Sequence, residues 1–401
     1  MSIIRDVTNK CLKYLQKDEI IIFLGARQAG KTTILKQIKN ILEKKGEISY
    51  FLNLEDPDYL ELLNKSPKSL FEIFNINTAR RNYVLIDEIQ YLNNPSNFLK
   101  YFYDEYKGKI KIIASGSSAF YIDRKFKDSL AGRKKIFNVW TLSFREFLRF
   151  KNEEELSKRN FKEISLQEKE KIVLYYNEYL IYGGYPRVVL SPLEEKKDIL
   201  REITYSYIKK DIYESDIRQE ETFYKLLKIL SHQIGNLVNS SELSNTLGCS
   251  KTAIDHYLYV LQKSFIISLI TPFFTNIRKE LTKMPKVYFN DLGLRNFLID
   301  DIKTFKTRID KGQLLENAVF RQLIENYEKD EIKFWRTIQN NEIDFIIKEN
   351  LAFEVKSDVK NFKESAYKSF LKFYPQINLN IVSFETDFKM GRFPIIEVWK
   401  L

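Results

Sequence analysis

An eight-residue stretch near the N-terminus has the residue types and spacing of a phosphate-binding loop. Residues 25–32 read Gly-Ala-Arg-Gln-Ala-Gly-Lys-Thr and fit the pattern G-x-x-x-x-G-K-[ST] in full. An apolar run ends at Leu24 and a helical pattern begins near Lys31, which is the context that this motif requires. Gly25 and Gly30 allow the chain to turn so that backbone N–H groups point at a β-phosphate, and the helix N-terminus adds partial positive charge.

This motif predicts a site for ATP and Mg²⁺. We expect Lys31 to bridge the β- and γ-phosphates and the Thr32 hydroxyl to ligate Mg²⁺. A chance match in a glycine turn is the alternative, and the strand-loop-helix context disfavours it. The residues expected around the nucleotide phosphates are Gly25, Ala26, Arg27, Gln28, Ala29, Gly30, Lys31, Thr32 and Thr33.

Two adjacent acids follow an apolar run at residues 83–86. We expect Asp87 to hold Mg²⁺ through water and Glu88 to orient or deprotonate the attacking water. A solvated strand end is the alternative for such a pair, but beside a complete P-loop the catalytic reading is preferred. The sequence shows no motif for an acceptor substrate, so hydrolysis is favoured over a kinase reaction.

A serine-rich segment, Ser115-Gly116-Ser117-Ser118, ends the next apolar run. A polar side chain at this position can sense a γ-phosphate and position water. Ser115 and Ser117 are both candidates, and a serine-rich turn without function is the alternative.

The elements that must position these groups alternate between two patterns. Short runs rich in β-branched and aromatic residues, at 19–24, 48–54, 83–86 and 109–115, are typical of buried strands of a parallel sheet. Amphipathic stretches at 31–45 and 95–106 have helical spacing. This order predicts a three-layer α/β domain.

Residues 239–254 have the layout of a helix-turn-helix. Ser240 or Ser241 is expected to cap the first helix, Gly248 to make the turn and Ser250 to cap the second. Two strand-like runs follow, which predicts a winged helix. Its second helix either enters a DNA groove or packs between domains, and the exposed Asp255 weakens the case for base readout.

A second set of candidate catalytic residues lies near the C-terminus. Asp344 is followed ten residues later by Glu354-Val355-Lys356, which matches the D…E-x-K core of PD-(D/E)XK nucleases. On adjacent antiparallel strands the two acids can share a divalent cation, Mg²⁺ or Mn²⁺, and Lys356 can position or activate water. Glu316, on a preceding helix, would complete the set of metal ligands. The order of elements resembles the restriction-endonuclease-like fold, and a fold without cleavage activity is the alternative.

The formal net charge of +11 and the isoelectric point near 9.2 favour an acidic partner, with DNA the leading candidate. No apolar run of membrane-spanning length occurs, so no membrane association is expected. Cys11 and Cys249 have no cysteine or histidine at ligand spacing, which argues against a disulfide framework and fits a cytoplasmic protein.

Several motifs together resemble prokaryotic AAA+-like ATPases akin to the STAND and archaeal ATPase clade, whose C-terminal half is a domain of unknown function. They are the P-loop, residues 86–90 (Ile-Asp-Glu-Ile-Gln), 115–118, 130–133 (Leu-Ala-Gly-Arg) and 142–147 (Leu-Ser-Phe-Arg-Glu-Phe). The resemblance implies that Pro186 lies in a helical lid against the nucleotide base. It also makes Arg133 a candidate to meet the γ-phosphate, in cis or from a neighbouring copy in a homo-oligomer, with a structural salt bridge as the alternative.

These expectations describe an α/β protein of four parts: a P-loop core at 1–150, a helical lid at 151–219, a winged helix at 220–295 and a nuclease-like domain at 296–401. The leading hypothesis is an ATPase whose nucleotide state controls the C-terminal half on DNA. The alternative is a STAND-type nucleotide switch or scaffold whose C-terminal domain binds a protein partner and cleaves nothing. A third hypothesis is a DNA-binding regulator.

Overall fold

The computed structural model describes residues 3–116, 130–215, 217–273, 283–337, 339, 341–384 and 393–401. The chain divides into two compact units, residues 1–141 and 142–401, with residues 263–265 grouped with the first. The three parts expected after the P-loop core therefore share one unit. Their finer boundaries stay a prediction.

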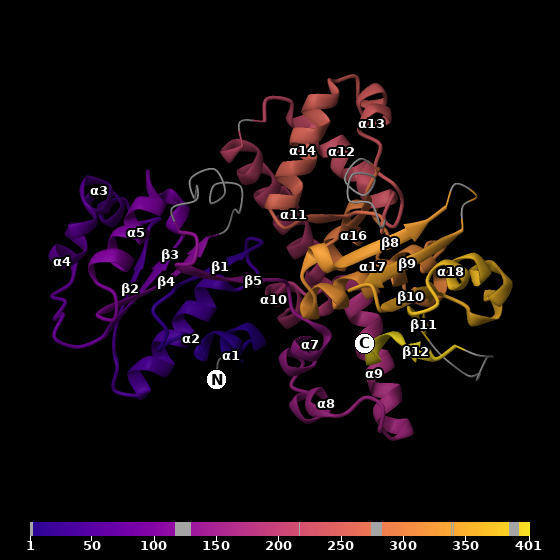
Figure 1. The fold of residues 1–401 in the computed structure, drawn as a ribbon, viewed down its shortest axis with the longest axis horizontal. Coiled ribbons are helices and arrows are strands. Elements are labelled where there is room, and N and C mark those ends of the chain that lie inside the picture. Colours follow the sequence, from indigo (N-terminus) through magenta and orange to yellow (C-terminus); the bar gives the residue numbers. More distant parts are fainter. Residues whose placement is uncertain are drawn as a thin grey trace. The chain divides into compact units, whose positions relative to one another are not determined.

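The first unit is built on a five-stranded parallel sheet with the order β2-β3-β4-β1-β5 (Figure 1). Its strands are β1 (Ile20–Gly25), β2 (Ile48–Asn53), β3 (Asn82–Asp87), β4 (Ile110–Gly116) and β5 (Lys134–Val139). Its helices are α1 (Asp6–Leu12), α2 (Lys31–Lys44), α3 (Pro57–Lys65), α4 (Leu70–Ile73) and α5 (Pro95–Glu105). The four strands and two helices expected from periodicity are confirmed to within one residue, whereas β5 was not foreseen.

Alternate residues of the central strands belong to two separate hydrophobic cores. Ile20, Ile22 and Leu24 of β1 pack with α5, while Ile21 and Phe23 of the same strand pack with α2. Successive side chains of a strand point to opposite faces, so this division places α2 and α5 on opposite sides of the sheet (Figure 1). A strand buried on both faces reads as a continuous apolar run, which is why these strands were recognisable from sequence.

The second unit begins with a set of helices. They are α7 (Phe144–Phe150), α8 (Glu154–Lys158), α9 (Leu166–Tyr182), α10 (Pro186–Leu190) and α11 (Lys196–Glu214). Ser143 and Ser165 start α7 and α9 with reciprocal hydrogen bonds to Glu146 and Glu168, the arrangement known as a capping box. No helix in the described part of the chain is long and apolar enough to cross a membrane.

Three further helices precede a two-stranded antiparallel sheet. They are α12 (Glu220–His232), α13 (Ser240–Leu247) and α14 (Lys251–Lys263), followed by β6 (Ile267–Ile270) and β7 (Lys286–Phe289). Leu237 adds an antiparallel bridge to Lys286. Gly248 makes the expected left-handed turn and Ser250 accepts from the Ala253 N–H, but Asn239, not Ser240 or Ser241, caps α13. The Asn239 side chain accepts the backbone N–H groups of Ser241 and Glu242 in the first turn of α13.

The C-terminal residues form a five-stranded mixed sheet with the order β12-β11-β10-β9-β8 (Figure 1). β8 (Ile332–Arg336), β9 (Glu342–Ile347) and β10 (Leu351–Lys356) are antiparallel neighbours, and β11 (Asn378–Ser383) and β12 (Ile395–Glu397) continue parallel to β10. The helices of this part of the chain are α16 (Leu292–Leu298), α17 (Lys311–Asn326) and α18 (Lys368–Phe373). The expected order from helix α17 through three strands and a helix to a further strand is observed.

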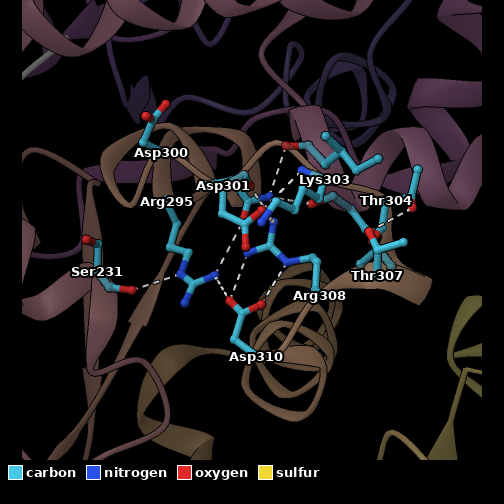
Figure 2. A network of polar contacts seen from close by, with 12 residues as sticks. Ser231, Arg295, Asp300, Asp301, Lys303, Thr304, Thr307, Arg308 and Asp310 are labelled. Carbon is cyan, nitrogen blue, oxygen red and sulfur yellow. Dashed lines mark hydrogen bonds and ion pairs between the residues drawn. The ribbon is translucent and has the colours of Figure 1, made fainter.

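A buried ion network fixes the start of α17 (Figure 2). Arg308 holds Asp310, the residue before α17, through two hydrogen bonds of 2.8 Å, and Arg295 of α16 reaches the same carboxylate. The Arg295 Nε also donates to the Ser231 carbonyl at the end of α12. Both guanidinium groups are almost fully buried, so this network ties α12, α16 and α17 together.

Candidate functional site

The P-loop connects the end of β1 to the start of α2. Gly30 adopts φ of +98°, a conformation that L-residues rarely reach, and it directly precedes the first helical residue, Lys31. A Cβ on Gly25 would lie 2.1 Å from the carbonyl oxygen of Val139 in β5. Both glycines of the motif are therefore required by the backbone itself.

Lys31 is held at this loop and is 5% exposed. Its ammonium donates to the Gly25 and Ala26 carbonyls at 2.8 and 2.7 Å. Arg5, which immediately precedes α1, steadies the other end of the loop by donating to the Ala29 carbonyl at 2.7 Å and to the Trp140 carbonyl at 3.0 Å. Sequence analysis did not foresee Arg5, because its partners lie 24 and 135 residues away.

Three side chains expected near Mg²⁺ or the γ-phosphate meet beside the loop. Asp87 is 2% exposed and accepts hydrogen bonds from the Ser115 and Thr32 hydroxyls. Burial raises the pKa of the Asp87 carboxyl, and the hydrogen bonds from Ser115 and Thr32 oppose that rise. A desolvated carboxylate of this kind is stabilised by a nearby cation, so the residues present fit Mg²⁺, which commonly takes one or two carboxylates and completes its shell with phosphate and water.

Glu88 follows Asp87 in a left-handed conformation with φ of +56°. Its backbone N–H donates to the Ser115 hydroxyl at 3.3 Å, and its carboxylate accepts from the Gln90 side chain. Gln90 is a site residue that sequence analysis did not single out. Its position two residues after Glu88 was the available signal.

Arg133 lies at the N-terminal ends of the parallel strands, whereas the P-loop lies at their C-terminal ends. Lys134, the next residue, pairs with Ile20 at the start of β1, and the loop follows Gly25 at the end of that strand. The length of β1 puts about 17 Å between these two ends. Arg133 forms an ion pair with Asp104 at 3.1 Å. The in-cis contact with a γ-phosphate is therefore wrong for this arrangement, and the structural salt bridge is observed.

Two other expected residues have different outcomes. Ser117 lies outside the described residues, so Ser115 is the serine that the structure places beside Asp87. Pro186 is the first residue of α10 in the second unit, and its expected contact with a nucleotide base stays a prediction.

The glycines that precede Pro186 have a structural role of their own. A Cβ on Gly183 would lie 2.2 Å from the Asp291 carboxylate, and the Gly184 N–H donates to that carboxylate at 2.9 Å. This turn is therefore tightly packed against the start of α16.

The C-terminal acids and lysine come together as the spacing indicated. Lys356 donates to Glu354 at 2.5 Å, and the Tyr367 hydroxyl donates to the same oxygen at 2.8 Å. The second carboxylate oxygen of Glu354 is buried and has no hydrogen-bond partner among the described residues. Asp344 accepts from the Val355 N–H at 2.8 Å, which joins β9 to β10 at this point.

An additional lysine, which sequence analysis did not foresee, occupies this cluster. The ammonium of Lys286 lies 3.1 Å from Glu316 and 3.8 Å from Asp344, and it also contacts Glu342. Burial alone would lower the pKa of Lys286, but the charges of Glu316, Asp344 and Glu342 outweigh it and raise that pKa above its ordinary value.

The carboxyl groups of the cluster are strongly perturbed. Burial first, and then the charges of Glu354 and Glu316, raise the pKa of Asp344 well above its usual range. Burial also raises the pKa of Glu354, which the attraction of Lys356 opposes. Among the described residues no group of three or more Asp, Glu, His or Cys side chains is arranged to hold a metal ion. The metal-binding role expected for Glu316, Asp344 and Glu354 stays a prediction.

Comparison with known proteins bears on the first unit directly. Residues 17–148 match a protein-family model described as an AAA domain, and this segment contains the P-loop, Asp87 and Glu88. The first unit is a P-loop domain of the AAA type. Beyond this AAA domain, residues 174–305 and 311–400 match two models, DUF8612 and DUF4143, each described as a domain of unknown function.

Similar proteins extend over most of the chain. An uncharacterized protein of Methanocaldococcus jannaschii, MJ1544, is 28% identical over 96% of this chain and 88% of its own length. One of Haemophilus influenzae is 27% identical over 86% of this chain and 85% of its own. Among solved structures, the replication initiator DnaA bound to AMPPCP and single-stranded DNA is 16% identical, covers 65% of this chain and 90% of its own, and has a TM-score of 0.30.

Proposed function

We propose that this protein is a Mg²⁺-dependent ATP hydrolase that uses the P-loop of its AAA domain. The observation that supports this best is the contact of Asp87 with the Thr32 and Ser115 hydroxyls, directly beside the loop that holds Lys31. A phosphate-binding loop alone fits any nucleotide-binding protein. A buried acid shared by two hydroxyls adds the metal-binding part that hydrolysis requires.

Each residue has one role in the proposed reaction. The N–H groups of residues 25–33 and the Lys31 ammonium bind the β- and γ-phosphates, while Thr32 and Asp87 hold Mg²⁺, Asp87 through water. Bound Mg²⁺ neutralises charge on the phosphate oxygens. Water attacks the γ-phosphorus, Glu88 accepts a proton from that water, and the bond to the β-phosphate oxygen breaks to release ADP and phosphate. Gln90 and the Ser115 hydroxyl hold Glu88 in place through its side chain and its backbone.

Phosphate release with purified protein tests this proposal. We expect Mg²⁺-dependent turnover that falls at least about 100-fold in Glu88→Gln, as removal of a general base predicts, while binding of a fluorescent ATP analogue is retained. Lys31→Ala should lose nucleotide binding as well. Turnover that is equal in wild-type protein and Glu88→Gln would contradict the assignment of Glu88.

We further propose that helices α12 to α14 with β6 and β7 form a winged helix, and that residues 296–401 form a restriction-endonuclease-like domain, both controlled by the nucleotide state. The helix order, the Leu237 bridge to Lys286 and the strand order of the C-terminal sheet support this proposal. The net charge of +11 favours DNA as the partner. DNA binding that weakens steeply with salt would support it, and salt-independent or absent binding would contradict it.

The second candidate is a nucleotide switch of the STAND type whose C-terminal domain binds a protein partner and cleaves nothing. The ion pairs of Lys286 with Glu316 and Asp344 favour this candidate over Mg²⁺- or Mn²⁺-dependent cleavage. Plasmid incubated with wild-type protein and with Lys356→Ala separates the two. Cleavage that disappears in Lys356→Ala would establish the nuclease.

We also propose that Arg133 acts in trans, in a homo-oligomer. Loss of turnover in Arg133→Ala only above the protein concentration at which the oligomer forms would support this role.

A further inference from the structure

Lys286 is the first residue of β7, and backbone pairing on both sides holds it in place. The residue pairs with Ile270 of β6 on one side and bridges to Leu237 on the other. Its side chain is 1% exposed. The Phe334 ring of β8 lies 5.4 Å from the ammonium, so an apolar wall closes one side of the site.

Charged groups of two further elements face this ammonium. Glu316 comes from α17, and Glu342 and Asp344 come from β9. The Asp310 network at the start of α17 fixes the helix that carries Glu316. A buried ammonium costs several kcal/mol unless charges and hydrogen bonds compensate it, and three carboxylates supply that compensation here.

Two of these carboxylates also accept hydrogen bonds from other groups. The Tyr288 hydroxyl, two residues along β7, donates to Glu316 at 2.6 Å, and the Val355 N–H donates to Asp344 at 2.8 Å. A Cβ on Gly235 would lie 2.9 Å from a Glu316 oxygen, so the segment before α13 packs closely on the same group. Glu316 thus lies at hydrogen-bond distance from the Lys286 ammonium and Asp344 at ion-pair distance, whereas a divalent ion requires oxygens at about 2.0 to 2.6 Å.

We propose that Lys286 is a built-in counter-cation that takes the place of a divalent metal ion between Glu316 and Asp344 and keeps this carboxylate cluster closed to metal. Lys286 and a divalent ion would compete for the same Glu316 and Asp344 oxygens, because two cations in contact with the same buried carboxylates repel each other strongly. The inference is independent of ATP hydrolysis at the P-loop. It specifies what must change before the C-terminal domain can perform metal-dependent chemistry: Lys286 must leave or lose its charge.

Binding of Mn²⁺ to nucleotide-free protein, measured by electron paramagnetic resonance, tests this inference. Lys286→Met removes the charge while keeping a long side chain, and Lys286→Arg retains the charge as the matched control. We expect Lys286→Met to gain one Mn²⁺ site that binds at least tenfold more tightly than any site in wild-type protein or Lys286→Arg. Adding Asp344→Asn to Lys286→Met should abolish the new site. A Lys286→Met protein that gains no site would overturn the proposal.

Lys286→Met leaves the buried Asp344 and the half-buried Glu316 without this cation, so its melting temperature is measured with and without Mn²⁺. We expect destabilisation that Mn²⁺ partly reverses in Lys286→Met and no comparable shift in wild-type protein. A second comparison needs no Lys286 variant: Mn²⁺ binding to wild-type protein and to Asp344→Asn alone. Equal, weak binding is expected. Mn²⁺ binding to wild-type protein that is lost in Asp344→Asn would overturn the proposal even if Lys286→Met does not fold.

Discussion

The Ser115 hydroxyl of β4 donates a hydrogen bond to the Asp87 carboxylate at the end of the neighbouring strand β3. The same hydroxyl accepts the Glu88 N–H, so one serine connects the expected metal-binding acid to the expected general base. Parallel strands bring their carboxyl ends to one edge of a sheet, which is how residues 28 positions apart in the chain meet beside the P-loop.

We expect Ser115→Ala to lower turnover about tenfold and to raise the Mg²⁺ concentration needed for half-maximal activity, because Asp87 loses a hydrogen bond worth about 1 to 2 kcal/mol in a buried site. Phosphate release measured across a Mg²⁺ titration checks this. Ser49→Ala in β2 is the matched control, since the buried Ser49 hydroxyl has no hydrogen-bond partner in the described structure. Equal Mg²⁺ dependence of the two variants would argue against a role for Ser115.

Arg5 predicts a contribution of the N-terminal segment to nucleotide affinity. Arg5→Met removes the hydrogen bonds to Ala29 and Trp140, so the P-loop loses part of its support. We expect KM for ATP to rise about tenfold with a smaller change in kcat, because loop positioning acts mainly on binding. Lys10→Met on the exposed side of α1 is the control and should leave both constants unchanged. A fall in kcat at constant KM would contradict this role.

The buried ion network predicts a large stability effect at Asp310. Asp310→Asn removes the carboxylate that the buried Arg295 and Arg308 share and leaves Arg308 only its ion pair with Asp301 at 3.7 Å, so we expect the free energy of unfolding to fall by about 3 to 5 kcal/mol. Urea denaturation followed by far-UV circular dichroism measures this. Asp300→Asn, at an exposed pair with Lys197, should have little effect. Similar losses of unfolding free energy in both variants would contradict the claim that burial makes the Asp310 ion pairs more important than the exposed pair of Asp300.

The same carboxylate predicts a dependence of stability on acid pH. Burial alone would raise the pKa of Asp310, but the hydrogen bonds from Arg308 and Arg295 outweigh it and hold that pKa at about 2, below the ordinary 3.8. Because the folded-state pKa is depressed, the stabilisation is complete above pH 4 and is lost as the pH falls through 2. We expect the stability difference between wild-type protein and Asp310→Asn to shrink by about 1 to 2 kcal/mol between pH 5 and pH 2.

Gly183 predicts a steric effect that can be separated from a conformational one. Gly183 has φ of +71°, and a Cβ there would overlap the Asp291 carboxylate. Gly46 has φ of +76° with no atom within 4 Å of the same position. Both alanine variants should lose about 1 kcal/mol from backbone strain, and Gly183→Ala should lose a further 1 to 3 kcal/mol from overpacking, as thermal unfolding would show. Equal losses would contradict the close packing at Asp291.

Local patterns carried much of the fold and of the P-loop site. A strand such as β1, buried on both faces, must be apolar throughout, and a loop that wraps phosphate needs glycines at fixed positions. Each therefore has a sequence pattern that can be recognised within a few consecutive residues. The edge strand β5 (Lys134–Val139) was missed because three of its six residues are exposed and its pattern is correspondingly weak.

The residues that sequence analysis missed act over long separations. Arg5 supports Ala29 from another element, and Lys286 faces Glu316 from 30 residues away. Neither lysine nor arginine is expected to be buried unless paired, and the pairing is visible only after the chain has folded. The same limit explains Arg133, because its motif could not reveal which end of the sheet it occupies.

The nucleotide that stays bound after one round of reaction tests the central claim most directly. Wild-type protein and Glu88→Gln are incubated with ATP and Mg²⁺, separated from free nucleotide, denatured with acid and analysed by chromatography. Hydrolysis at the P-loop with Glu88 as the base predicts bound ADP in wild-type protein and intact ATP in Glu88→Gln. Intact ATP in both, or equal amounts of ADP in both, would contradict it.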